Sequence, residues 1–215
     1  GYDDNEIFHG LGGNDTIRGN EGNDIIHGDA GDDVIYGGNG SDELYGDEGN
    51  DTIYGGNGAD IVTGGTGNDY MSGEAGNDTY IFNLGDGTDS IYDYENSSES
   101  GSADRIVFGK GIEKEKVRLS RNGSNLVIQY SEKDSVTVQN AYYYEDGRCF
   151  VENIEFADGT VWGKEEINEY AHERYGSEGN DDMSGYGRES GYDDNEIFHG
   201  LGGNDTIRGN EGNDI

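Results

Sequence analysis

The 215-residue sequence has no proline, one cysteine (Cys149) and only 13 basic residues. A single cysteine excludes an intrachain disulfide framework, and we interpret it as a structural side chain. No apolar run reaches the length of about 18 residues that a membrane-spanning helix needs. Neither a signal peptide nor an initiator methionine opens the sequence, so we expect a fragment of a longer protein.

The shortage of basic residues leaves 47 acidic residues unbalanced, with a formal net charge of −34. This charge makes nucleic acid and anionic membrane surfaces poor partners, because binding would add repulsion instead of releasing counterions. We expect no nucleic-acid partner and no membrane insertion. So acidic a chain with 30% hydrophobic residues would normally be disordered. A multivalent cation that neutralises ordered carboxylates reverses that expectation, and calcium prefers oxygen ligands.

The charge divides the sequence into three blocks. Residues 1–93 contain 21 acidic residues and one basic residue, residues 94–175 contain 16 and 10, and residues 176–215 contain 10 and two. The blocks predict a domain over 1–93, a module of ordinary composition over 94–175, and a second acidic segment over 176–215.

Glycine is abundant, with 40 residues, and much of it belongs to a repeat. Residues 10–81 form eight consecutive nonapeptides with glycine at positions 1 and 4, aspartate at position 6 and a large apolar or aromatic residue at position 8. Residues 1–9 are a decayed copy in which Glu6 replaces the aspartate. Such glycine density excludes a helix.

Each repeated position has a physical role. The two glycines permit a tight turn, and positions 7 to 9 form a very short strand with position 8 pointing inward and positions 7 and 9 outward. Two nonapeptides close one turn of a flattened coil, so equivalent positions of every second nonapeptide stack at about 4.8 Å. The sequence therefore predicts an all-β fold of parallel strands.

Stacking places the position-6 aspartates in two columns. One column contains Asp15, Asp33, Asp51 and Asp69, and the other contains Asp24, Asp42, Asp60 and Asp78. Carboxylates at this spacing repel one another unless a cation lies between them, and loop carbonyls can complete the six- to eight-oxygen shell of calcium. Three adjacent pairs in each of the two columns give at least six calcium sites. Residues 85–93 keep Asp89 in repeat-like spacing and end the coil.

The pattern GGxGxDxUx, where U is a large apolar residue, resembles the RTX, or haemolysin-type, calcium-binding nonapeptide family. The resemblance implies a right-handed parallel β-roll with calcium along both edges and position-6 aspartates that bridge neighbouring ions. It also implies ligation by the position-1 carbonyls of Gly10, Gly19, Gly28, Gly37, Gly46, Gly55, Gly64 and Gly73. Position 5 would add Asn14, Asn23, Asp32, Asn50, Asn68 and Asn77, whereas Ser41 and Ala59 depart from that pattern.

The middle block alternates like β-strands. The predicted strands are ADRIVF, VRLSR, LVIQY, SVTVQ, FVENIEF and TVW, with turns at NGSN and ADGT, after a linker at 97–102. A helix is predicted over 164–175, with Ile167, Tyr170, Ala171 and Tyr175 on one face. The segments DRIVFGKGI and IEFADGTVW resemble a small β-rich module that accompanies RTX repeats. We expect an antiparallel β module with a C-terminal helix that caps the last turn of the roll.

Residues 191–215 repeat residues 1–25 without a difference. GSEGNDDMS, residues 176–184, begins this second roll, and GYGRES, residues 185–190, is a shortened, imperfect copy. Asp181, Asp205 and Asp214 are its candidate calcium ligands. We interpret the chain as a slice of a tandem array whose unit, a roll plus a module, corresponds to residues 1–190; a cloning artefact is the alternative.

No motif indicates catalysis. The sequence lacks GxSxG and HExxH, Cys149 has no assigned histidine partner, and the GxG motifs belong to turns. Among 47 acidic residues, a carboxylate pair for glycoside hydrolysis is not excluded. His9, His27 and His199 occupy the outward position 9 and are interpreted as surface residues. We therefore expect no enzyme.

The sequence favours a calcium-dependent extender segment of a large secreted bacterial protein, an adhesin or surface protein. Its expected partners are calcium ions, neighbouring identical units and a cell-surface or glycan ligand, and type I secretion is implied by the family. One alternative is the C-terminal calcium and export region of a toxin or hydrolase. Another is a carbohydrate-binding module that uses exposed tyrosines such as those at 142–144.

Overall fold

A computed structural model describes residues 4–94, 103–143, 151–176, 178–185, 196–209 and 214–215. The predicted linker over 97–102 and Cys149 lie outside the described residues. Within these ranges, no helix combines the length and apolar character needed to cross a membrane.

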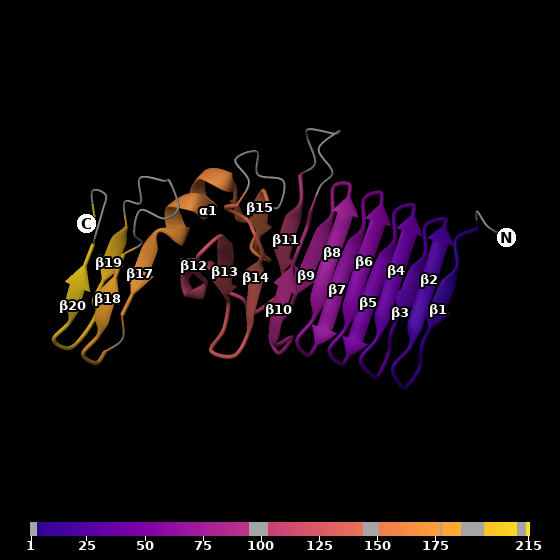
Figure 1. The fold of residues 1–215 in the computed structure, drawn as a ribbon, viewed down its shortest axis with the longest axis horizontal. Coiled ribbons are helices and arrows are strands. Elements are labelled where there is room, and N and C mark those ends of the chain that lie inside the picture. Colours follow the sequence, from indigo (N-terminus) through magenta and orange to yellow (C-terminus); the bar gives the residue numbers. More distant parts are fainter. Residues whose placement is uncertain (1–3, 95–102, 144–150, 177, 186–195, 210–213) are drawn as a thin grey trace.

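Most of the described strands belong to two eight-stranded sheets that extend along the long axis of the molecule (Figure 1). The first sheet contains, in spatial order, β1 (Ile7–His9), β3 (Ile25–His27), β5 (Glu43–Glu48), β7 (Ile61–Thr66), β9 (Thr79–Phe82), β11 (Arg105–Phe108), β15 (Asn153–Glu155) and β16 (Val161–Trp162). The second contains β2 (Thr16–Glu21), β4 (Val34–Asn39), β6 (Thr52–Asn57), β8 (Tyr70–Ala75), β10 (Thr88–Ile91), β14 (Ser135–Val138), β13 (Asn125–Gln129) and β12 (Arg118–Asn122).

The strands of the repeat are parallel, and each pairs with the strand two nonapeptides further along the chain. Ile35 of β4 pairs with Ile53 of β6, and Leu44 of β5 pairs with Val62 of β7. Two nonapeptides therefore make one turn, as predicted, and the parallel β-roll is confirmed. Position 8 forms the core, with zero exposure at Ile26, Ile35, Leu44, Ile53, Val62, Met71 and Tyr80.

β1 and β3 span positions 7 to 9, as predicted. Most other strands of the roll are longer, because they extend beyond position 9. β6, for example, has six residues and includes the first three positions of the following nonapeptide. The glycine-containing positions also pair with the neighbouring turn, as Gly38 does with Gly56 and Asn39 with Asn57. Pairing of consecutive turns therefore extends beyond the apolar residues.

The middle block continues both sheets of the roll instead of forming a sheet of its own. β11 pairs in parallel with β9 and β15, and β14 pairs in parallel with β10. The pairs β12–β13, β13–β14 and β15–β16 are antiparallel. The predicted strands and turns are present, but the module is a mixed extension of the roll, and a domain boundary at residue 94 stays a prediction.

Aromatic side chains fill the core where the roll meets the module. Phe108 packs against Phe82 and Phe156, with ring centroids 6.4 and 5.6 Å apart. Phe156 and Trp162 pack edge to face, with ring centroids 4.6 Å apart. The thin aliphatic column of the roll thus widens into a larger core.

The helix is shorter than predicted, because α1 spans only Lys164–Ala171. A short 3-10 helix, η1 (Lys114–Lys116), lies much earlier in the module. Ile167 and Ala171 are buried, as expected for the inner face of α1. The remaining residues 173–175 form β17 (Glu173–Tyr175), because their backbone pairs with β19 (Ile197–His199). Tyr175 therefore lies on a strand, and the prediction of a helix to residue 175 was wrong.

The second roll begins immediately after the helix. β17 pairs with β19, and β18 (Asp182–Ser184) pairs with β20 (Thr206–Arg208), both in parallel. Its turn contains more residues than a turn of the first roll, as the separation of hydrogen-bonded aspartates shows. The N–H of Asp181 donates to Asp205, whereas the N–H of Asp33 donates to Asp51. The difference equals the length of GYGRES, most of which lies outside the described residues.

We expect close stacking of the turns to make position 4 intolerant of a side chain wherever a preceding turn lies against it. A Cβ on Gly40 (φ +134°) would collide with the carbonyl oxygen of Gly22, whereas a Cβ on Gly13 (φ +114°) meets nothing within 4 Å. Gly13→Ala should lower the free energy of unfolding by about 1–2 kcal/mol through backbone strain alone. Gly40→Ala should lower it by a further 1–3 kcal/mol or so, from overpacking. Urea denaturation at saturating calcium measures both, and equal losses would contradict this packing.

Candidate metal centres

The position-6 aspartates end each turn directly before a strand and form the two predicted columns. The backbone N–H of Asp33 donates to Oδ1 of Asp51 at 2.7 Å, and that of Asp42 donates to Oδ1 of Asp60 at 2.8 Å. The same bond recurs along each column, and most of these side chains are 1–3% exposed. One carboxylate oxygen of each aspartate from Asp24 to Asp78 is thus fixed by the preceding turn.

The other carboxylate oxygen is buried and lacks a hydrogen-bond partner. Among the described residues this holds for Oδ2 of Asp15, Asp24, Asp33, Asp42, Asp51, Asp60, Asp69 and Asp89. Buried polar atoms are almost always hydrogen-bonded, and a buried charge needs a counter-charge. Each of the two rows of such oxygens fits a row of cations.

The position-1 glycines border the same space. A Cβ on Gly28 would lie 2.5 Å from Oδ2 of Asp33 and 2.7 Å from the carbonyl oxygen of Gly46, one turn away. A Cβ on Gly19 would lie 2.5 Å from the carbonyl oxygen of Gly37. The absence of side chains therefore leaves room between carboxylate and carbonyl oxygens, a set of hard ligands suited to calcium. The position-6 carboxylates and position-1 carbonyls are the groups that would hold it.

Position 5 lies in a separate, exposed ladder. Oδ1 of Asn14 accepts the backbone N–H of Asp32 at 3.1 Å, and Oδ1 of Asp32 accepts that of Asn50 at 2.9 Å. Asn23, Asn50, Asn68 and Asn77 accept equivalent backbone bonds from the next turn. This ladder ties consecutive turns together on the outside of the loops, and calcium ligation by position 5 stays a prediction.

Both columns continue beyond the nonapeptides, and the second column reaches the module. The first column reaches the predicted Asp89, whose Oδ1 accepts the N–H of Asp69 at 2.9 Å. In the second, Oδ1 of Asp104 accepts the N–H of Asp78 at 2.8 Å, and the N–H of Asp104 donates to Glu152 at 2.9 Å. Asp104 was not predicted, because the chain between Asp78 and Asp104 is longer than two nonapeptides. Its local signal was an aspartate two residues before a buried strand residue, the spacing of the nonapeptides.

The end of the second column gathers three buried carboxylates. Asp78, Asp93 and Asp104 are 1%, 2% and 3% exposed, and each offers an oxygen within 4.8 Å of the others. Asp93 accepts hydrogen bonds from the Tyr80 hydroxyl at 2.7 Å and from the Glu74 backbone N–H at 2.9 Å. Burial raises the pKa of Asp104 to about 9, and the neighbouring carboxylates add to the shift. Asp93 was not predicted as a ligand either, because its segment has left the nonapeptide register.

Burial raises the pKa values of the column carboxylates. The pKa is about 7 for Asp51 and Asp60, about 6 for Asp69 and about 8 for Asp89, with repulsion from neighbouring carboxylates as a smaller cause in each case. An ion-free column therefore takes up protons near neutral pH, and calcium and protons compete for the same oxygens.

The second roll repeats this arrangement over the turn that the structure describes. The N–H of Asp181 donates to Oδ1 of Asp205, and that of Glu196 donates to Oδ1 of Asp214, both at 3.1 Å. A Cβ on Gly176 would lie 2.9 Å from Oδ2 of Asp181. The three predicted aspartates thus occupy column positions, with Glu196 in the place of Glu6.

Comparison with known proteins gives two family matches. The model of the RTX calcium-binding nonapeptide repeat (4 copies) matches residues 1–35, 19–53, 28–62, 36–71, 54–91 and 190–215. The model of the haemolysin-type calcium binding protein related domain matches residues 125–166. Together the first set of matches covers more than half of the chain.

Individual proteins resemble parts of the chain. It is 41% identical over 110 residues to the iron-regulated protein FrpA of Neisseria meningitidis serogroup C, an alignment that covers 50% of this chain and 10% of FrpA. The extracellular lipase LipA from Serratia marcescens aligns with 90% of this chain and 33% of its own, at 14% identity and a TM-score of 0.39. The AlgE6R3 subunit of the Azotobacter vinelandii mannuronan C5-epimerase aligns over 74% and 81%, at 26% identity and a TM-score of 0.29. At these TM-scores the fold rests on the strand pairing of the chain itself.

We predict that protons partly replace calcium. Carboxylates whose pKa is raised by folding stabilise the ion-free roll below their ordinary pKa of 3.8, and this stability is lost as the pH rises through about 7. The calcium-free chain should therefore be more structured at about pH 5 than at about pH 8, and calcium binding should tighten over the same interval. Circular dichroism and calcium titrations measure both trends. An apo chain that gains structure as the pH rises would contradict the assignment.

We predict that Asp104 couples the module to the calcium columns. Asp104→Asn should raise the calcium concentration needed to fold the module, because it removes one of three carboxylates at the junction. Trp162, the single tryptophan, reports module folding by fluorescence. Asp60→Asn, in the middle of the same column, is the matched control and should affect the module less. Equal effects of the two variants on Trp162 would show that Asp104 has no special part at the junction.

Proposed function

Because the chain belongs to the RTX calcium-binding nonapeptide repeat family, we propose that it is a non-enzymatic extender segment of a large secreted bacterial protein. The observation that carries this proposal is the set of eight buried carboxylate oxygens without a hydrogen-bond partner in the described residues. A fold with these oxygens needs a cation between its turns, so its stability is set by the calcium concentration around it.

Calcium couples folding to the cellular compartment. In calcium-poor cytosol the aspartates of neighbouring turns repel one another, and the chain stays unfolded and suited to export through a narrow channel. Outside the cell, millimolar calcium binds the folded state alone and draws the chain into it. The net charge of −34 strengthens both effects.

The joint between the module and the second roll supports a stiff array. α1 ends at Ala171, and β17 begins at Glu173 after the single residue His172. The guanidinium of Arg118 lies 4.6 Å from the ring centroid of Tyr175, and the ring of His199 stacks on Tyr175 at 4.6 Å. Packing across so short a connection restricts bending between consecutive units.

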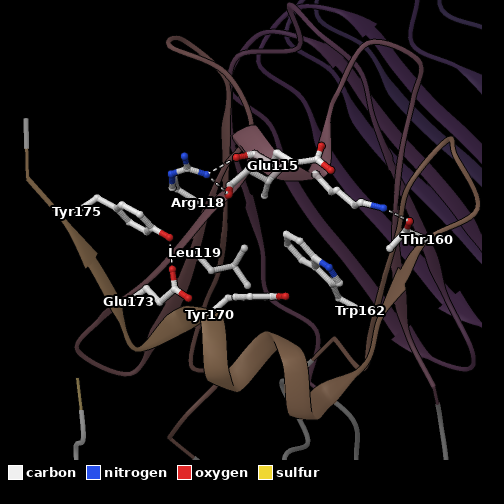
Figure 2. A pocket seen from close by; sticks show the side chains of 10 residues that line it. Glu115, Arg118, Leu119, Thr160, Trp162, Tyr170, Glu173 and Tyr175 are labelled. Carbon is white, nitrogen blue, oxygen red and sulfur yellow. Dashed lines mark hydrogen bonds between the residues drawn. The ribbon is translucent and has the colours of Figure 1, made fainter. Parts of the chain in front are cut away.

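A pocket of about 470 Å³ at this joint is the place where a glycan could bind the module (Figure 2). Its aromatic rings already have partners: Trp162 packs against Phe156 and Tyr170, with centroids 4.6 Å apart in both pairs. Tyr175 also contacts Arg118 and His199. These contacts favour a structural joint over a platform for sugar rings. The alternative of an export region of a toxin or hydrolase predicts a catalytic domain, and not further copies of the unit, in the parent reading frame.

We expect the chain to be unfolded at neutral pH in excess EGTA and folded in millimolar calcium, with several ions bound per chain. Circular dichroism follows the folding, and calorimetry counts the ions. Magnesium at the same concentration is the control and should not replace calcium, because it demands a smaller, octahedral shell. The same folded spectrum in EGTA, with no ions detected by calorimetry, would falsify the proposal.

A further inference from the structure

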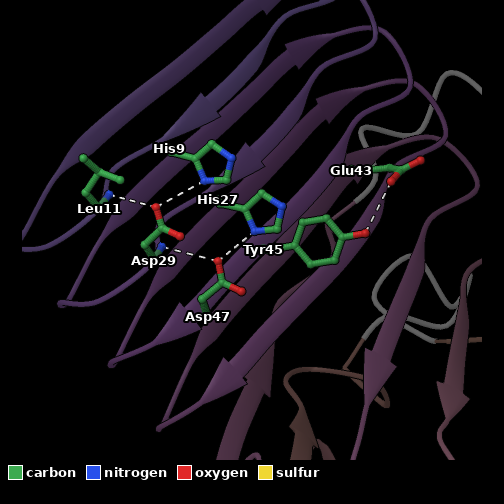
Figure 3. A network of polar contacts seen from close by, with 7 residues as sticks. All are labelled: His9, Leu11, His27, Asp29, Glu43, Tyr45 and Asp47. Carbon is green, nitrogen blue, oxygen red and sulfur yellow. Dashed lines mark hydrogen bonds and ion pairs between the residues drawn. The ribbon is translucent and has the colours of Figure 1, made fainter.

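The outer face of the first sheet carries a column of aromatic rings at position 9 (Figure 3). The imidazoles of His9 and His27 stack with centroids 4.9 Å apart, and His27 stacks on Tyr45 at 4.6 Å. These rings point away from the core, on the side opposite to the position-8 residues. The calcium functions described above do not use them.

Two aspartates at position 2 lie beside the imidazoles. Nδ1 of His27 is 2.8 Å from Oδ2 of Asp47, and Nδ1 of His9 is 3.3 Å from Oδ2 of Asp29. Asp29 and Asp47 have φ angles of +67° and +72°, in the left-handed region that favours glycine. Several other nonapeptides have glycine at this position, for example Gly56 with φ +114°. The chain thus places carboxylates where a glycine would be less strained.

We propose that His27, Asp29 and Asp47 bind a zinc ion on this face, outside the calcium columns. Each residue offers a ligand atom, and these atoms all lie within 4.8 Å of one another. The ligands of a tetrahedral zinc ion lie about 3.3 Å apart, so the site needs only small side-chain movements. One imidazole and two carboxylates leave a fourth position for water.

The ligand chemistry separates this site from the calcium columns. Calcium takes oxygen ligands, whereas imidazole nitrogen suits zinc and other late transition metals. Zinc would bind the unprotonated Nδ1 of His27 and so replace the proton of the His27–Asp47 hydrogen bond. In the absence of zinc, His27 and Asp47 form a hydrogen-bonded pair.

The zinc site depends on the calcium-folded state, and in this respect it rests on the proposed function. Asp29 directly follows Gly28, and Asp47 directly follows Gly46, two glycines whose carbonyls are predicted calcium ligands. His27 and Asp47 belong to consecutive turns and meet only when these turns are stacked. Zinc should therefore find this site only in calcium-loaded protein.

The experiment is a titration of the full chain with Zn²⁺ at saturating calcium, by calorimetry. We expect one site per chain that calcium does not displace, and at least tenfold weaker binding in His27→Ala and Asp47→Gly. Asp47→Gly is the sharper variant, because it installs the residue that Gly38, Gly56 and Gly65 provide in other nonapeptides and should preserve calcium-dependent folding. His199→Ala is the control: His199 pairs with one carboxylate, Glu173, and its loss should leave zinc binding unchanged.

Circular dichroism of each variant with and without calcium keeps the two proposals distinguishable. Failure of calcium to fold the wild-type chain would count against the extender. If the chain folds with calcium but binds no zinc, or binds it equally well after Asp47→Gly, the zinc site is refuted.

Discussion

Repulsion between stacked carboxylates is the constraint on which the rest of the structure depends. The repeat places aspartates of consecutive turns close enough for the N–H of one to donate to the carboxylate of the next, as from Asp33 to Asp51 at 2.7 Å. That bond uses one oxygen and leaves the other buried against its neighbours. Without a cation, burial keeps some of these groups protonated near neutral pH. A divalent ion between turns would satisfy the oxygens of both, and each ion would then join two turns that local chain propensity does not hold together.

The glycines follow from the same spacing. Position 1 must lack a side chain because the carboxylate of its own nonapeptide and a carbonyl of the next turn occupy the space where a Cβ would lie, as at Gly28. Position 4 must lack one because a backbone carbonyl of the adjacent turn lies there, as at Gly40. The glycine pattern is therefore a consequence of the close stacking of consecutive turns.

The sequence predicts the part of the fold that repeats and the strands of the module, but it does not predict how the module joins the roll. The stacking of every second nonapeptide, the inward position 8 and the two aspartate columns follow from the nonapeptides alone. Asp104 could not be placed, because the insertion after Asp78 hides its column position until the pairing of β9 with β11 is known. The helix was extended too far because residues 173–175 have helical composition, and their pairing with β19 outweighs that local preference. Strand length was underestimated because backbone pairing of the glycine positions leaves no hydrophobic signal.

The ends of the columns show how the roll terminates without a further turn. An ion inside a column would receive carboxylates from the turns on both sides, whereas an ion at the end would lack one of these neighbours. In the second column the module compensates with Asp104, and Asp93 adds a third buried carboxylate that the Tyr80 hydroxyl holds in place. In the first column Asp134 lies near Asp89, close enough to raise its pKa, and accepts the backbone N–H groups of Gly85 and Gly87. The module therefore supplies negative charge as well as apolar cover, which explains why its strands continue the sheets of the roll instead of packing across their end.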